Sequence, residues 1–187
     1  CNASLGKYGA GCFFDNNTRD YIEIGDKSIL ESMEALTVEV WVKTTTETGL
    51  PIISKWYTSQ TSYVLRTSTT TAGAIRFSTS TDADTHVNSD STSTVNDGGW
   101  HHVVGTYDGA NQRVYIDGVL EDTDAQTETI ENSQEELCIG AYCNGGDPNI
   151  LDTFNGSIDE VRIYKRALAA EEIRTHYLRG SGFGASG

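Results

Sequence analysis

The sequence predicts an all-β protein, a two-sheet antiparallel β-sandwich with one short C-terminal helix. Short segments rich in β-branched and aromatic residues recur along the 187-residue chain, separated by turn residues. The connections between them are too short for the helical crossovers that parallel strands require. One amphipathic segment, residues 169–178, has acidic residues in its first turn and Gly180 as its expected stop. Many short strands followed by a single late helix are typical of a sandwich.

The strongest strand signals lie between residues 98 and 121. Residues 100–107 are rich in aromatic and β-branched side chains and end at Asp108-Gly109. Residues 113–116 alternate polar and apolar with a period of two. Asp117-Gly118 then tolerates the positive φ that a two-residue type I′ hairpin needs at both central positions. We therefore predict a tight antiparallel meander here.

Residues 36–43 form the clearest amphipathic strand. Every second residue is aliphatic and shares one face, whereas the alternate face carries Thr37, Glu39, Trp41 and Lys43. Trp41 is expected to lie in the core, and so is Trp100. Further strands are expected at residues 21–24, 52–55, 63–67, 74–80, 137–141 and 158–164, with strands and an irregular loop in the polar stretch 78–95.

Length and charge limit the possible classes of protein. The length corresponds to one domain, residues 1–178, followed by a linker-like tail, 179–187. The net charge of −14, from 27 acidic and 13 basic residues, argues against nucleic-acid binding, which needs a basic surface. No apolar run approaches the roughly 20 residues of a membrane span, so no membrane insertion is expected. An acidic surface suits calcium binding or a well-hydrated extracellular surface.

The four cysteines, at positions 1, 12, 138 and 143, permit three complete pairings. They fall into two local pairs, Cys1 with Cys12 and Cys138 with Cys143, and neither pair has the spacing of a structural zinc site. We predict two short-loop disulfides and therefore an oxidising, extracellular or cell-surface setting. Free thiols in a cytosolic protein are the alternative.

Four ordered blocks of the chain match a known family. They are the first-strand region at residues 14–22, the strand at 36–43, the motif W-x-H-V-x-x-T-Y-D-G at 100–109, and the segment 154–164. Over residues 6–178 the chain resembles the LamG-like jelly-roll domains of the concanavalin A-like lectin/glucanase superfamily. The resemblance implies a jelly-roll fold. It implies little about function, because this fold carries lectins, adhesion modules, hydrolase accessory domains and enzymes.

The catalytic motif of related glycoside hydrolases is absent. In those enzymes the catalytic motif resembles E-x-D-x-x-E on one strand, and two of its carboxylates flank the scissile bond. No E-x-D occurs here; the residues two positions after Glu39 and Glu160 are Trp41 and Arg162. We therefore expect no enzyme, and a glycoside hydrolase or lyase with an unfamiliar site is the less favoured alternative.

The histidines give no catalytic signature either. His101 and His102 are adjacent in a predicted strand, so they point to opposite faces and cannot share one site. The resemblance implies a structural role for His102. His86 and His176 have no partner nearby in the sequence and receive no role.

A structural calcium ion is expected on the strength of the resemblance. Similar domains tie the first-strand loop to an aspartate of the last strand through such an ion, which implies Asp15, Asn17 and Asp159 as ligands, with Asp20 in reserve. Carboxylate and amide oxygens are the ligands that Ca²⁺ prefers. The alternative is that Asp15 or Asn17 only caps a turn.

Sugar binding needs exposed rings for stacking and polar groups that fix hydroxyl geometry. Trp56 and Tyr57 are expected just past a strand, in a polar loop, as a stacking platform. A second candidate loop follows Tyr142 and is fixed by the predicted disulfide. The complete set of predicted ligand-binding residues is Trp56, Tyr57, Tyr142, Asn144, Asp147 and Asn149. The alternative is that Trp56 covers a core edge and the later loop only turns.

These features predict a non-catalytic, extracellular carbohydrate-binding module of a larger secreted or surface protein. Its partner would be an oligo- or polysaccharide, and neither nucleic acid nor an inserted membrane. The alternative is an adhesion or spacer domain that contacts other surface proteins.

Overall fold

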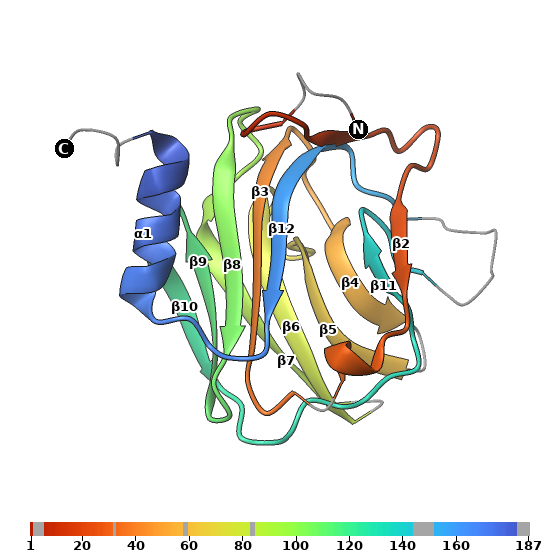
Figure 1. The fold of residues 1–187 in the computed structure, drawn as a ribbon, viewed down its shortest axis with the longest axis vertical. Helices are drawn as coiled ribbons and strands as arrows, with labels where there is room; N and C mark the ends of the chain where they lie inside the picture. The colour runs from red at the N-terminus through yellow and green to blue at the C-terminus, as the bar shows by residue number, and fades with distance from the viewer. Residues whose placement is uncertain (2–5, 32, 58–59, 83–84, 144–151, 183–187) are drawn as a thin grey trace.

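Two six-stranded antiparallel sheets pack face to face in the computed structural model, which describes residues 1, 6–31, 33–57, 60–82, 85–143 and 152–182 (Figure 1). We call the sheet ordered β1-β12-β3-β8-β9-β10 the helix-side sheet and the sheet ordered β2-β11-β4-β5-β6-β7 the far sheet. The predicted sandwich is confirmed. Its elements are β1 (Cys12–Phe14), β2 (Ile22–Gly25), η1 (Ser28–Leu30), β3 (Leu36–Thr44), β4 (Pro51–Tyr57), β5 (Gln60–Thr67), β6 (Ala74–Asp82), β7 (Thr85–Thr94), β8 (His101–Tyr107), β9 (Asn111–Ile116), β10 (Val119–Ala125), β11 (Leu137–Ile139), β12 (Gly156–Tyr164) and α1 (Ala170–Ser181).

The meander β8-β9-β10 forms as predicted from its turn residues. β9 and β10 pair directly across a two-residue turn, with Ile116 opposite Val119. Asp117 has φ 51° and Gly118 has φ 76°, the two positive values of a type I′ turn. Asp117 also caps the neighbouring strand, because its Oδ1 accepts the backbone N–H of His102 at 2.8 Å.

β3 is the central strand of the helix-side sheet and is buried on both faces. Its aliphatic residues face the core between the sheets, as the alternation predicts. Its polar face is buried as well, with Thr37 and Glu39 at 0 % and Trp41 at 2 % exposure. Trp41 therefore lies beneath α1 and the N-terminal segment, which we define as residues 6–11, rather than between the sheets. Trp100 is only half-buried. Trp41 is thus buried as expected, although outside the core between the sheets, whereas Trp100 is not buried as fully as expected.

The helix α1 runs beside β8 and β10 and covers the outer face of this sheet (Figure 1). It extends three residues beyond the predicted end, and Gly180 does not stop it. Gly180 is buried inside the helix, and Gly182, with φ 83°, is the left-handed C-cap. Arg179 to Ser181 therefore belong to the helix and not to a tail. This helix, the one α-helix of the described chain, is too short and too polar to cross a membrane.

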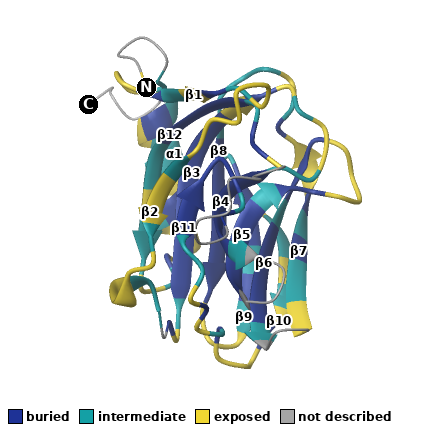
Figure 2. Ribbon diagram, turned by 90° about the vertical axis from the view of Figure 1, so that its right-hand side faces the viewer, coloured by how far each residue is buried: buried dark blue, intermediate teal, exposed yellow. Residues whose placement is uncertain are grey.

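In the polar stretch 78–95 the described residues 78–82 and 85–94 are strand, as expected, and residues 83–84, where the expected loop would fall, lie outside the described residues. β6 and β7 pair with each other, and most of β7 is exposed or half-buried at its sheet edge (Figure 2). Carboxylates of β10 accept the N–H groups that the edge strand β7 would otherwise leave unpaired. Asp122 accepts from Asp90 N–H at 3.0 Å, and Glu121 accepts from Thr92 and Ser93 N–H at 3.2 Å.

Both predicted disulfides are present, Cys1–Cys12 and Cys138–Cys143, and none of the four cysteines is free. Cys1–Cys12 attaches the N-terminus to β1. Cys138–Cys143 closes the turn that follows β11, with Ala141 buried between the two half-cystines.

Candidate functional site

A groove of about 450 Å³ opens on the outer face of the helix-side sheet, between the N-terminal segment, β12 and α1. Three aromatic side chains, two arginines, a histidine and a glutamate line it. These residues are Tyr8, Trp41, Glu160, Arg162, Tyr164, His176, Arg179 and Gly180.

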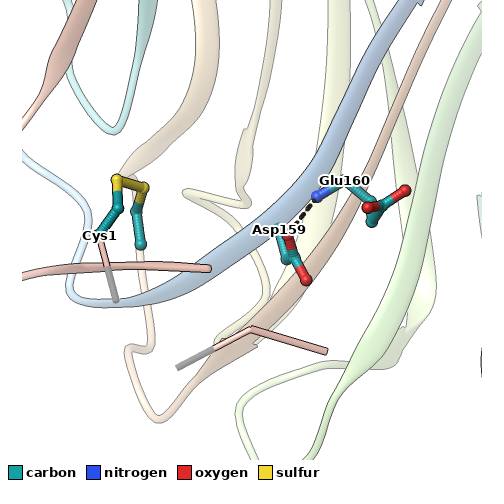
Figure 3. The surroundings of a disulfide bond; sticks show 4 residues. Cys1, Asp159 and Glu160 are labelled. Carbon is teal, nitrogen blue, oxygen red and sulfur yellow. Dashed lines mark hydrogen bonds between the residues drawn. A yellow bond between two sulfur atoms is a disulfide. The ribbon is translucent and has the colours of Figure 1, made fainter. Parts of the chain in front are cut away.

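A β-bulge in β12 supplies the polar wall of the groove. Asp159 pairs with Trp41 and Arg162 pairs with Glu39, so β12 has two residues where β3 has one. Glu160 occupies the bulge with φ 53°, a left-handed conformation that is costly for a residue with a side chain. Figure 3 shows the carboxylates of Asp159 and Glu160 diverging, while the Glu160 N–H donates to Asp159 Oδ1 at 2.9 Å. The bulge thus turns Glu160 into the groove and keeps Arg162 on the same surface.

The buried carboxylate of Glu39 forms the floor beneath this wall. It accepts from His102 Nε2 at 2.9 Å, from His176 Nδ1 at 3.1 Å to both oxygens, and from Arg162 Nη1 at 3.4 Å. Burial alone would raise the pKa of Glu39. Hydrogen bonds and charge from the two imidazoles outweigh burial, so the pKa lies below its ordinary value and the carboxylate stays ionised.

The N-terminal segment supplies the aromatic edge. Tyr8 N–H donates to Asp159 Oδ2 at 2.9 Å, which fixes the segment against β12. The Tyr8 ring meets Trp41 edge-on with centroids 6.3 Å apart, and Lys7 Nζ lies 4.8 Å from the Trp41 centroid. On the other side Trp41 stacks on Tyr177 of α1 at 6.0 Å. Trp41 is therefore held between the N-terminal segment and the helix.

The phenol groups of the groove remain protonated donors. Burial, followed by the charge of Glu160, raises the pKa of Tyr8. Burial and then the charge of Glu39 raise the pKa of Tyr164. Arg162 pairs with Glu160 across the bulge. Rings, phenols, guanidinium groups and a carboxylate thus meet in one groove, which equips it to stack on and hydrogen-bond a polar ligand.

Those sequence-predicted sugar residues that the structure describes lie away from this groove, in or next to strands of the far sheet. Trp56 is inside β4 rather than past it, half-buried, with its ring 5.2 Å from His86. Tyr57 ends β4. Tyr142 is half-buried and its hydroxyl accepts from Arg66 Nη1 at 3.3 Å. The remaining predicted residues, Asn144, Asp147 and Asn149, lie outside the described residues.

The predicted calcium ligands do not converge. Asp15 Oδ1 accepts the backbone N–H and the Nδ2 of Asn17, both at 2.8 Å, and Asp20 accepts the Asp15 N–H at 3.1 Å. This is the turn-capping role considered as the alternative. In the β1–β12 register Phe14 pairs with Gly156, which places Asp159 about four residues, or roughly 13 Å, from Asp15.

A metal centre of another composition is also not evident. Within the described ranges no three His, Cys, Asp or Glu side chains gather closely enough to hold a metal ion. Calcium binding by the loop at residues 15–20 stays a prediction, and the structure gives it no support from Asp159.

Most residues that line the groove were not predicted as site residues from the sequence. His176, which received no partner, contacts Glu39, and His86, also left without one, contacts the Trp56 ring. The prediction that His101 and His102 face opposite ways is confirmed, because His101 pairs with Asp97 and Asp117 instead. A signal for the groove was present: Ile173, His176, Tyr177 and Gly180 follow the i, i+3, i+4, i+7 spacing of a buried helix stripe.

Comparison with protein families shows a match over most of the chain. The model of the Concanavalin A-like lectin/glucanases superfamily matches residues 16–174. A search of curated protein sequences finds no significant match.

Several solved structures share the fold. The binding domain of Paraclostridial Mosquitocidal Protein 1 superposes with a TM-score of 0.73 at 13% identity, over 96% of this chain and 45% of that one. Domain 4 of AbnA, a GH43 extracellular arabinanase from Geobacillus stearothermophilus in complex with arabinotriose, gives 0.69 at 18% identity, over 92% and 78%. The binding domain of Botulinum neurotoxin DC in complex with rat synaptotagmin II gives 0.65 at 13% identity, over 86% and 40%. This chain spans less than half the length of the two toxin domains, and at these identities the likeness shows the fold alone.

Proposed function

Because this chain belongs to the Concanavalin A-like lectin/glucanases superfamily, we propose that it is a non-catalytic carbohydrate-binding module of a larger extracellular or cell-surface protein. The sugar site in this proposal is the groove between the N-terminal segment, β12 and α1. Family membership does not select this function by itself, since the fold serves many functions.

The groove is the observation that carries the proposal. A pyranose or furanose ring presents C–H faces that stack on aromatic side chains and hydroxyls that exchange hydrogen bonds with polar groups. Tyr8, 43% exposed, offers an accessible ring at the rim. Arg162 and Glu160 provide a donor and an acceptor in fixed positions beside it, because each orients the other.

The arrangement of carboxylates supports the non-catalytic part of the proposal. Glycoside hydrolysis needs two carboxyl groups that flank the scissile bond. In the described lining of the groove the accessible carboxylate is the half-buried Glu160, whereas Glu39 beneath it is fully buried and engaged by His102, His176 and Arg162. A substrate in the groove would therefore meet one available carboxylate.

Two further observations support the setting and the ligand class. The two disulfides, Cys1–Cys12 and Cys138–Cys143, suit an oxidising, extracellular environment. The structure of the arabinanase domain holds arabinotriose, which shows that a domain of this fold accommodates an oligosaccharide.

A glycan array followed by titration calorimetry tests the proposal. We expect oligosaccharide binding by the wild type and a loss of about tenfold or more in affinity for Tyr8→Ala, because one stacking ring is removed. Tyr21→Ala is the matched control: Tyr21 is 41% exposed, close to the 43% of Tyr8, and lies outside the groove.

A third variant separates the two candidate sugar sites. Binding that survives Tyr8→Ala but is lost in Trp56→Ala would move the site to the far sheet. If the wild type bound no glycan on the array, the proposal of a carbohydrate-binding module would be rejected and the adhesion or spacer alternative would be favoured.

A further inference from the structure

The charge of the groove contrasts with that of the whole molecule. The chain carries a net charge of −14, yet Arg162 and Arg179 line the groove and Lys7 Nζ lies beside it over Trp41. Against these three cations the described lining of the groove sets the carboxylate of Glu160, which is half-buried. The other two acids nearby, Glu39 and Asp159, are 0% and 8% exposed.

The buried acids are already satisfied by the protein. Glu39 accepts from two imidazoles and from Arg162. Asp159 accepts the backbone N–H groups of Tyr8 and Glu160. Their oxygens are therefore engaged in holding the fold and are not free to bind a ligand's cation or hydroxyl.

The groups that remain for a ligand are mostly donors. Arg179 is exposed, and neither Arg179 nor Lys7 pairs with a carboxylate in the part of the chain that the structure describes. A guanidinium has five N–H donors and no acceptor, and an ammonium has three donors. A hydroxyl needs both donors and acceptors, whereas a carboxylate only accepts, so a donor-rich groove suits a carboxylate better than a neutral ring.

We propose that the groove selects saccharides that carry a carboxylate, with Arg179 as the residue that recognises the acid group and the rings beside it holding the sugar. This inference rests on the proposed carbohydrate-binding function and narrows its ligand class. Arg179 and the carboxylate form charge-assisted hydrogen bonds, which are shorter and stronger than those of neutral pairs. Lys7 adds a second positive charge from the N-terminal side.

Matched sugar pairs that differ only in the acid group test the inference. Titration calorimetry with trigalacturonic acid against its methyl ester, and with sialyllactose against its sialic acid methyl ester, measures the contribution of the carboxylate. We expect at least one acidic member to bind about tenfold or more tightly than its neutral partner. Arg179→Gln should reduce that difference to nearly zero.

Arg174→Gln is the matched control, because Arg174 is exposed on the same helix and does not line the groove. Arg174→Gln should leave the preference for the acidic sugar unchanged. If Arg174→Gln and Arg179→Gln weakened the preference equally, the preference would come from the overall charge of the helix, and the assignment to Arg179 would be overturned. Equal binding of acidic and neutral members would overturn the inference while the proposed function stands. Binding of neutral glycans on the array without binding of either acidic sugar would also overturn the inference and leave the proposed function standing.

Discussion

At residue 39 a carboxylate with no solvent exposure lies between two imidazoles and a guanidinium. We expect Glu39→Gln to lower the free energy of unfolding by about 2–4 kcal/mol, because the amide places N–H donors against imidazole donors in a buried site. Urea denaturation measures the change. Glu160→Gln is the control: it alters a solvent-accessible acid in the same groove and should cost less than about 1 kcal/mol. Equal losses in the two variants would contradict a special role for the buried contacts.

The same residue predicts a pH dependence. The pKa of Glu39 is lowered in the folded state, so its contribution to stability is present above the ordinary value of 4.5 and is lost as the pH falls through the folded pKa. The stability difference between wild type and Glu39→Gln should therefore shrink below about pH 4.5. A difference that stays constant down to pH 3 would show that ionisation of Glu39 does not stabilise the fold.

Among the elements, α1 depends on the absence of a side chain at residue 180. A Cβ at Gly180 would collide with the Trp41 ring and lie 2.8 Å from the Tyr8 hydroxyl. Helix propensity favours alanine over glycine by about 1 kcal/mol, but we expect the collision to win and Gly180→Ala to destabilise by about 1–3 kcal/mol. Thermal denaturation checks this result, with Trp41 fluorescence as a second readout.

Gly182→Ala provides the comparison for that helix. Nothing lies within 4 Å of a Cβ there, so only the left-handed backbone, with φ 83°, resists the substitution. Its cost should be about 1 kcal/mol and its Trp41 fluorescence should match the wild type. A stabilised Gly180→Ala variant would mean that α1 packs less closely on the sheet than this structure shows.

The elements also show what the sequence predicts and why it stops there. Alternation in β3 identifies the face that enters the core, because the period of a strand is a local property. It does not reveal that the opposite face is covered, since that depends on α1, which begins more than 120 residues later. For the same reason Glu39 and His176 could be identified as residues of interest only once the two elements were docked. The bulge at Glu160 could not be predicted from the neighbouring sequence, because it arises from the pairing of β12 with β3.

The whole molecule combines these local contacts with a large net charge. Among the described residues the pKa values of seven carboxyl groups are lowered in the folded state, whereas those of Glu135 and Glu136 are raised. The seven are Asp26, Glu39, Asp90, Asp97, Asp108, Glu121 and Glu172. Groups with a lowered pKa stabilise the fold above their ordinary pKa values, so acid should denature this protein even though it removes negative charge.

At neutral pH the net charge of −14 opposes the compact state through mutual repulsion. Salt shortens the Debye length from about 30 Å at 0.01 M to about 3 Å at 1 M, which screens this repulsion more than it screens the buried contacts of Glu39. We expect the melting temperature at pH 7 to rise by several degrees between these limits, at about 2–4 °C per kcal/mol for a domain of this size. Sodium and potassium chloride should act alike, since screening depends on ionic strength. Calcium chloride at equal ionic strength separates screening from binding: an additional rise that a chelator reverses would support an ion in the loop at residues 15–20. A melting temperature that falls with salt would show that surface ion pairs outweigh the repulsion and would contradict this account of the acidic surface.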